Sequence, residues 1–189
     1  MSKSIYETLE MAKKQYYIGN YDNTIELSSQ IMYLKSYQCS ALYLIGKSYL
    51  QLEDYIMAED IFTNLVLFSR SSYPYLYLAY IHLLDGNFEN SIQSCMYIIE
   101  DDEENWIAHL FLGINYYKTN DIKAAVNMFW SVHTLLQKDI HLVIYFLIKS
   151  NLKLCKYDES IKLSKLLNNV VENEESRYLT NNFPKIYTL

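Results

Sequence analysis

Ala-Leu-Tyr-Leu-Ile-Gly-Lys-Ser-Tyr-Leu-Gln-Leu-Glu-Asp-Tyr, residues 41 to 55, is followed at short distance by Ala58 and Phe62. Its apolar side chains recur at the spacing of a helix, at Leu42, Ile45, Tyr49 and Leu52. Two narrow residues, Gly46 and Ala58, stand twelve positions apart. The stretch therefore predicts two helices that approach closely where both are narrow, since bulky side chains would hold them apart.

The same pattern returns along the chain with a period of about 34 residues. A large apolar residue followed, except in the last copy, by a small one occurs at Met11-Ala12, Ile45-Gly46, Leu78-Ala79, Leu112-Gly113 and Leu147-Ile148. Twelve positions after the second member stands another narrow residue, in turn Thr24, Ala58, Ser91, Ala125 and Ser160. Such fixed-period similarity indicates stacked repeats, each one a pair of helices.

Turn-forming residues separate the two helices of each pair. The breaks fall at Gly19-Asn20, Glu53-Asp54, Gly86-Asn87, Asn120-Asp121 and Cys155-Lys156. The expected helices are 4–18, 21–34, 38–52, 55–69, 73–85, 88–100, 105–119, 122–137, 140–154 and 157–169. Because no segment alternates with a period of two, no strands are expected.

These residues resemble the tetratricopeptide repeat (TPR) family, most clearly at residues 41–55 with Ala58 and Phe62, and next at Leu112-Gly113, Tyr116, Ala125 and Phe129. The resemblance covers residues 4–169. It implies an all-α fold, a right-handed α-solenoid of about five repeats with a C-terminal capping helix in one domain, 1–189. The expected repeats are 4–37, 38–71, 72–104, 105–139 and 140–169, followed by a cap and tail, 170–189.

The sequence departs from the family in its fifth repeat and its tail. Ile148 occupies the narrow position, and Asn151 stands where an aromatic residue is usual, so looser packing is expected there. The tail is expected to be a short helix that covers the last apolar face, since a solenoid must end on a polar surface. Asn181-Asn182-Phe183-Pro184 is expected to be irregular.

Composition argues against several classes of protein. A charge of −6 and a pI near 5.2 disfavour nucleic acid as a partner. The longest apolar run, Leu142–Ile148, is too short to span a bilayer, and acids near the N-terminus argue against a signal peptide. We therefore expect no membrane association and a cytoplasmic or nuclear location. Cys39, Cys95 and Cys155 are too widely spaced to predict a disulfide framework or a zinc site.

No catalytic, cofactor-binding or metal-binding motif is present. His82, His109, His133 and His141 fall at four different points of the repeat, which favours structural roles. The acidic run Glu100–Glu104 lacks the spacing and glycine of a calcium loop and is interpreted as a solvated loop before a helix N-terminus. The chain is expected not to be an enzyme and to need no cofactor.

By resemblance, the first helix of each repeat lines a concave surface with five of its positions. The protein-binding groove implied is rich in tyrosine and leucine and comprises Tyr6, Leu9, Lys13, Tyr16, Tyr17, Tyr43, Lys47, Leu50, Tyr73, Leu76, Tyr80, Leu83, Leu84, Ile107, Leu110, Ile114, Tyr117, Tyr145 and Lys149, with Lys153 at its C-terminal end. The lysine and asparagine with which chaperone adaptors of this family hold a carboxylate are absent. The 20 tyrosines also fit a general composition bias.

The leading hypothesis is a non-enzymatic scaffold that binds a helix, a peptide or a second copy of itself, as a homodimer, in this groove. Residues 111–125 are similar to the repeat subunits of the anaphase-promoting complex, which suggests a subunit with a cell-cycle role. A bacterial-type assembly factor or secretion chaperone is a second possibility. A substrate-recruiting fragment of a larger enzyme is a third.

Overall fold

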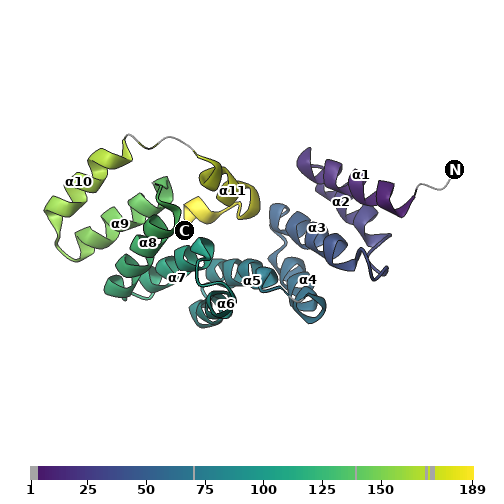
Figure 1. Ribbon diagram of the computed structural model, residues 1–189, viewed down its shortest axis with the longest axis horizontal. Helices are drawn as coiled ribbons and strands as arrows, with labels where there is room; N and C mark the ends of the chain where they lie inside the picture. Colours follow the sequence, from purple (N-terminus) through teal and green to yellow (C-terminus); the bar gives the residue numbers. More distant parts are fainter. Residues whose placement is uncertain (1–3, 70, 139, 169, 171–172) are drawn as a thin grey trace. The chain divides into compact units, whose positions relative to one another are not determined.

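The computed structural model describes residues 4–69, 71–138, 140–168, 170 and 173–189 (Figure 1). Residues 1–3, the predicted repeat ends at 139 and 169, and part of the predicted tail lie outside these ranges. The described residues form helices and turns without a strand. The chain divides into two compact units, Met1–Leu78 and Ala79–Leu189, with the division inside one helix.

The first unit contains the first two helical pairs. Its helices are α1 (Ile5–Tyr17), α2 (Tyr21–Ser29), α3 (Gln38–Gln51), α4 (Tyr55–Phe68) and the start of α5 (Tyr73–Leu84). The second unit continues with the end of α5, then α6 (Phe88–Asp101), α7 (Trp106–Lys118), α8 (Ile122–Leu136), α9 (His141–Lys153), α10 (Tyr157–Leu167), α11 (Glu174–Asn182) and the 3-10 helix η1 (Ile186–Thr188).

The first ten helices begin within one residue of their predicted starts. The main difference is α2, which ends at Ser29 and not at residue 34. Tight i to i+3 hydrogen bonds follow, such as Ile31 N–H to the Ser28 carbonyl, 3.1 Å. This turn brings Ile31 into a buried cluster with Leu9 and Ala41. Core packing therefore ends α2 earlier than periodicity suggests.

All five hinges contain a residue in the left-handed region. Their φ values are 79° at Gly19, 61° at Glu53, 75° at Gly86, 69° at Asn120 and 59° at Cys155. The next residue caps the following helix in four hinges: Asn20, Asp54, Asn87 and Asp121 accept a hydrogen bond from a backbone N–H three residues on. Lys156 offers no such side-chain bond. The fifth hinge thus has neither glycine nor a cap.

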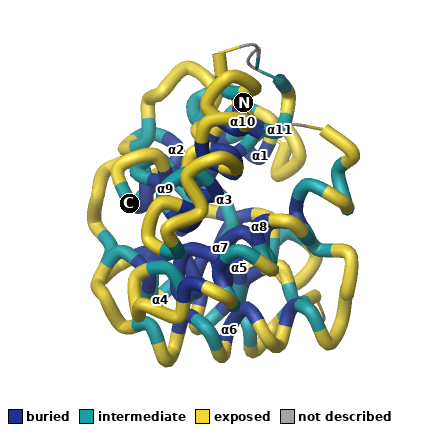
Figure 2. The backbone as a smooth tube through the Cα atoms, turned by 90° about the vertical axis from the view of Figure 1, so that its left-hand side faces the viewer, coloured by how far each residue is buried: buried dark blue, intermediate teal, exposed yellow. Residues whose placement is uncertain are grey.

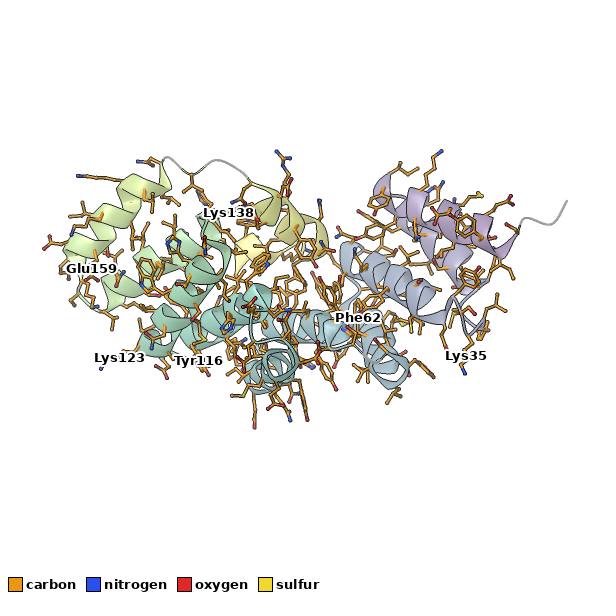
Figure 3. All side chains as sticks on the ribbon, in the orientation of Figure 1. Lys35, Phe62, Tyr116, Lys123, Lys138 and Glu159 are labelled. Atoms are coloured by element: carbon orange, nitrogen blue, oxygen red, sulfur yellow. The ribbon has the colours of Figure 1, made fainter. Side chains whose placement is uncertain are left out.

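The narrow residues lie where the paired helices touch, and they do so in two ways. In the second and fourth pairs a glycine faces a phenylalanine, Gly46 against Phe62 and Gly113 against Phe129; a Cβ on these glycines would lie 2.8 and 2.6 Å from the rings (Figure 3 labels Phe62). In the other pairs the later narrow residue is Thr24, Ser91 or Ser160, and its hydroxyl donates to the carbonyl twelve residues earlier.

In the second unit, the Ser91 hydroxyl belongs to a longer chain of buried hydrogen bonds. The Asn115 side-chain amide donates to Ser91 Oγ at 2.8 Å, and the Ser91 hydroxyl donates to the Ala79 carbonyl at 2.7 Å. All three residues are buried. The chain of bonds fixes α5, α6 and α7 in register, because a slip would leave a buried polar group unpaired.

Burial changes within individual helices, as the alternating dark blue and yellow segments in Figure 2 show. The buried segments include both narrow positions of the first four pairs. The exception is Ile148, which is only half-buried, in the repeat where looser packing is expected. No helix in the described ranges is both long and apolar enough to cross a membrane.

Candidate protein-binding surface

The structure separates the predicted groove residues into two classes. Those on the accessible side are Tyr6, Tyr17, Tyr73 and Tyr145, which are exposed, and Lys13, Tyr16, Tyr43, Lys47, Leu84, Tyr117 and Lys149, which are half-buried. Those in the core are Leu9, Leu50, Leu76, Tyr80, Leu83, Ile107, Leu110 and Ile114. Only the first class is available to an outside partner while the chain keeps this conformation.

In the first unit, one lysine lies over a tyrosine ring, and other predicted groove tyrosines are accessible or partly buried on the same unit. We call Tyr16, Tyr17, Tyr43, Lys47 and Tyr73 the first-unit surface. The Lys47 ammonium lies 4.8 Å from the centroid of the Tyr16 ring, a cation–π distance, and no carboxylate of the described residues pairs with it. Burial lowers the pKa of Lys47.

Tyr43 is the member of this surface whose ring packs inward and whose hydroxyl is buried. Its ring packs edge-on against Phe62 and Tyr77, with centroids 6.3 and 6.1 Å away. Its buried hydroxyl has no hydrogen-bond partner among the described residues. Burial, together with the nearby Tyr73, raises the pKa of Tyr43. Because this hydroxyl is buried, Tyr43 offers a partner the accessible part of its ring and not its hydroxyl.

The second unit carries another group of lysines and tyrosines, on α7 and α9. Lys149 Nζ donates to Tyr145 Oη at 2.9 Å, and this bond is the main reason that the pKa of Lys149 is raised. Lys153 Nζ lies 4.0 Å from the Tyr117 ring centroid, and Lys149 Nζ lies 5.9 Å from it. The structure thus brings together four residues that repeat position assigns to one surface.

The C-terminal segment occupies the surface formed by Tyr80 and Phe111. The Phe183 ring packs edge-on against both, with centroid distances of 5.1 and 5.0 Å. The Lys185 backbone N–H donates to Tyr80 Oη at 2.7 Å. The Tyr178 ring packs edge-on against Trp106 at 6.4 Å, and Figure 1 shows α11 in yellow near α7.

An ion pair also holds the segment at its start. Lys138 Nζ lies 2.8 Å from Glu175 Oε1. The hydrogen bond from Lys138 holds the pKa of Glu175 below its ordinary value, and the same bond raises the pKa of Lys138. The Lys138 side chain is largely exposed, so the pair orients α11 more than it stabilises the fold.

The docking of this segment was missed by sequence reasoning. Asn181 and Asn182 belong to α11 and are not irregular, and the Asn182 amide donates to the Tyr178 carbonyl at 2.8 Å. A signal was present, because the spacing of Leu179, Phe183 and Ile186 places three apolar residues on one face of a helical turn. All three are fully buried.

The histidine, acidic and cysteine residues considered above lie in surroundings that suit a structural role. His109 Nε2 lies 3.0 Å from the Glu103 carbonyl, and Asp102 accepts a hydrogen bond from the Glu104 N–H. The first two residues of the acidic run end α6, and only residues 102–104 form the expected turn before α7. Cys95 is buried and Cys155 exposed, with Cys39 between them in exposure. Within the described ranges, no three histidine, cysteine or acidic side chains gather as metal ligands would.

Comparison with known proteins identifies the fold. No protein-family model and no curated protein matches the sequence. MamA from Desulfovibrio magneticus RS-1, from its residue 41 to its end, matches with a TM-score of 0.77 at 10% identity over 89% of this chain and 96% of that one. Another MamA crystal structure gives 0.73 at 14% identity over 95% of each chain. A thermophilic TPR protein of Thermus thermophilus gives 0.68 at 18% identity over 98% and 100%.

These matches confirm the predicted fold class, an all-α, TPR-like solenoid. The predicted capping helix is present as α11, although it packs on α5 and α7. At such identities the matches show the arrangement of helices and nothing of the partner.

Proposed function

We propose that this TPR fold serves as a non-enzymatic scaffold that binds a helix or extended peptide on the inner surface of its repeats, within a multiprotein complex. The observation that carries the proposal is the first-unit surface. Tyr17 is 84% exposed and Tyr73 42%, and Lys47, which lies over the Tyr16 ring, pairs with no carboxylate of the described residues. Exposed aromatic groups of this kind are common anchors of protein interfaces.

The chemistry of the surface indicates the kind of peptide it accepts. Rings of tyrosine bury wide apolar area, and each well-buried anchor contributes on the order of 1.5 to 3 kcal/mol of transfer free energy. A carboxylate of the partner would pair with Lys47 and oppose the effect of burial on its pKa. A segment that combines a large apolar residue with an acidic one therefore fits best.

A peptide-library selection against the purified chain tests the proposal. Selected peptides should bind about tenfold more weakly, or worse, to Tyr17→Ala and Lys47→Ala variants, which is a loss of roughly 1.4 kcal/mol. Ile56→Ala, at an 82% exposed position of α4, is the matched control and should leave binding unchanged. Equal losses in all three variants, or no selected peptide, would contradict the proposal.

Self-association through the same surface is a narrower proposal, supported by the exposed tyrosines of the first unit. Light scattering should then report a homodimer, and Tyr17→Ala with Tyr73→Ala should convert it to a monomer. A monomeric parent chain would exclude this version and leave binding of outside segments. Tyr80 and Leu83 are unsuitable for this test, since both are buried.

The role within the anaphase-promoting complex is also narrower, and residues 111–125 are its support. That stretch includes Gly113 and Ala125, two narrow positions that the other repeats of this chain also fill with small residues, except at Ile148. The broader proposal of a protein-binding scaffold in the cytoplasm or nucleus does not depend on it.

A further inference from the structure

We infer that Tyr80, Trp106 and Phe111 form a second docking site, for an amphipathic helix with a leucine and, four residues later, a phenylalanine. Residues 174–188 are its built-in occupant, which an external helix of the same chemistry displaces. The inference deepens the proposed function and rests on it, because it names a further site and its ligand.

The occupant shows what the site recognises. The Phe183 ring packs edge-on against both the Tyr80 ring and the Phe111 ring, and Leu179, four residues earlier, is fully buried. The Tyr80 hydroxyl accepts a backbone N–H just after the phenylalanine. Recognition thus uses two apolar side chains and one main-chain group, which a foreign helix followed by a turn can reproduce.

The segment leaves uncovered what a terminal cap would cover. A cap hides the last apolar face of a solenoid, which here belongs to α10. Yet Tyr157, Ile161 and Leu166 of α10 remain exposed, the first two by 59% and 55%. The segment instead reaches α5, two repeats earlier in the sequence, and α7, one repeat earlier. The segment therefore lies on α5 and α7, which are the first helices of their repeats, and these are the helices on which a ligand of such a repeat protein is expected to lie.

The docked segment is also imperfectly packed. Buried Ser176 Oγ and Glu175 Oε2 have no hydrogen-bond partner among the described residues. An open surface pocket of about 280 Å³ lies beside the segment and the start of α9, lined by His141, Val170, Ser176, Thr180 and Tyr187. Unpaired buried polar atoms weaken an interface, so a better-matched helix can compete.

The length of α11 couples its folding to its docking. It has nine residues, and only Ser176, Leu179 and Asn182 among them are buried. A helix this short is marginal in water by itself. Release of the segment therefore unfolds α11, and the regained conformational freedom favours exchange.

Competition by a peptide tests the inference. The probe is a labelled peptide of residues 173–189, added to the full-length chain in a Trp130→Phe background, so that Trp106 alone reports docking. If the resident segment covers the site nine-tenths of the time, the peptide binds about tenfold more weakly than to an open site. Phe183→Ala in the chain should therefore raise affinity about tenfold, whereas the same change in the peptide should abolish binding.

Two further variants provide a test that remains valid if the Phe183→Ala chain does not fold. Glu175→Ala in the chain removes the ion pair of the resident segment at the surface, while the peptide keeps its own Glu175, so it leaves the core intact and should raise affinity for the peptide by a smaller factor. Tyr80→Phe, combined with Glu175→Ala to reduce competition by the resident segment, retains the ring but loses the acceptor for the Lys185 N–H of the peptide, and should weaken peptide binding. Ile161→Ala, on exposed α10, is the control and should change nothing.

Equal peptide affinity in the parent, Phe183→Ala and Glu175→Ala chains would overturn the inference. So would amide hydrogen exchange in α11 as slow as in α7, because the segment would then leave only with the whole unit. A failure here with peptides still selected by the first-unit surface would leave the proposed function standing.

Discussion

Gly113→Ala is expected to destabilise the second unit, although alanine is the better helix former. The new Cβ would lie 2.6 Å from Phe129 Cε1, with two more ring atoms within 3.0 Å. Phe129 cannot easily yield, because it is fully buried and its ring stacks on Phe146 with centroids 5.3 Å apart. Overpacking of a tight core costs about 1 to 3 kcal/mol, and this contact favours the upper end.

The helix propensity of alanine offsets about 1 kcal/mol of that cost. The net loss is then roughly 2 kcal/mol, or a decrease of about 4 to 8 °C in Tm for a chain of this size. Urea unfolding followed by circular dichroism, together with a thermal scan, measures both quantities. Gly46→Ala should lose less, since its Cβ would lie 2.8 Å from Phe62.

A double-mutant cycle identifies the cause. Phe129→Leu shortens the opposing side chain, so Gly113→Ala should cost at least about 1 kcal/mol less in that background. Ala79→Gly is the matched control at the same repeat position, where Cys95 stands in place of the ring, and it should lose only the propensity of alanine, about 1 kcal/mol. Unchanged or increased stability of Gly113→Ala, or additivity with Phe129→Leu, would refute the argument from close packing.

Three other changes follow from the hinges and the tail. Glu53→Gly should stabilise the first unit by up to about 1 kcal/mol in urea unfolding, because φ is 61° there; a loss would show that the Glu53 side chain matters more than the backbone. Lys156→Asp supplies the missing N-cap of α10 and should add about 1 kcal/mol, seen as slower amide exchange in its first turn; unchanged exchange would contradict it. The pKa of Glu175 is lowered in the folded chain, so its contribution is present above the unfolded pKa and is lost as pH falls through the folded value. Amide exchange in α11, corrected for its intrinsic pH dependence, should accelerate below about pH 4, and Lys138→Ala should remove that step.

The repeat architecture was predictable because its determinants are local. A left-handed residue followed by a capping residue defines each hinge, and Asp54 and Asp121 cap their helices where the sequence indicates. Narrow residues twelve positions apart, such as Ala79 and Ser91, set the closeness of each pair. Helical periodicity and turn chemistry act over a few residues, so they can be read without coordinates.

The candidate surfaces were predictable only in part. The repeat position of Lys149 and Tyr145 places them together, since both lie on one helix one turn apart. Burial of Tyr80, by contrast, depends on Phe183 and on Lys185, which lies 105 residues away in sequence. Spacing within one repeat carries no information about such a partner.

By itself the amino-acid sequence determined the all-α class, the repeat register and the hinges, because each arises from interactions between residues less than one repeat apart. The tertiary structure alone decided which of the predicted groove residues stay accessible. For Tyr80, access depends on where the chain returns after α10, and that return accompanies the burial of Leu179, Phe183 and Ile186. Hydrophobic burial is non-directional, so an apolar stripe shows that a segment will dock but not where.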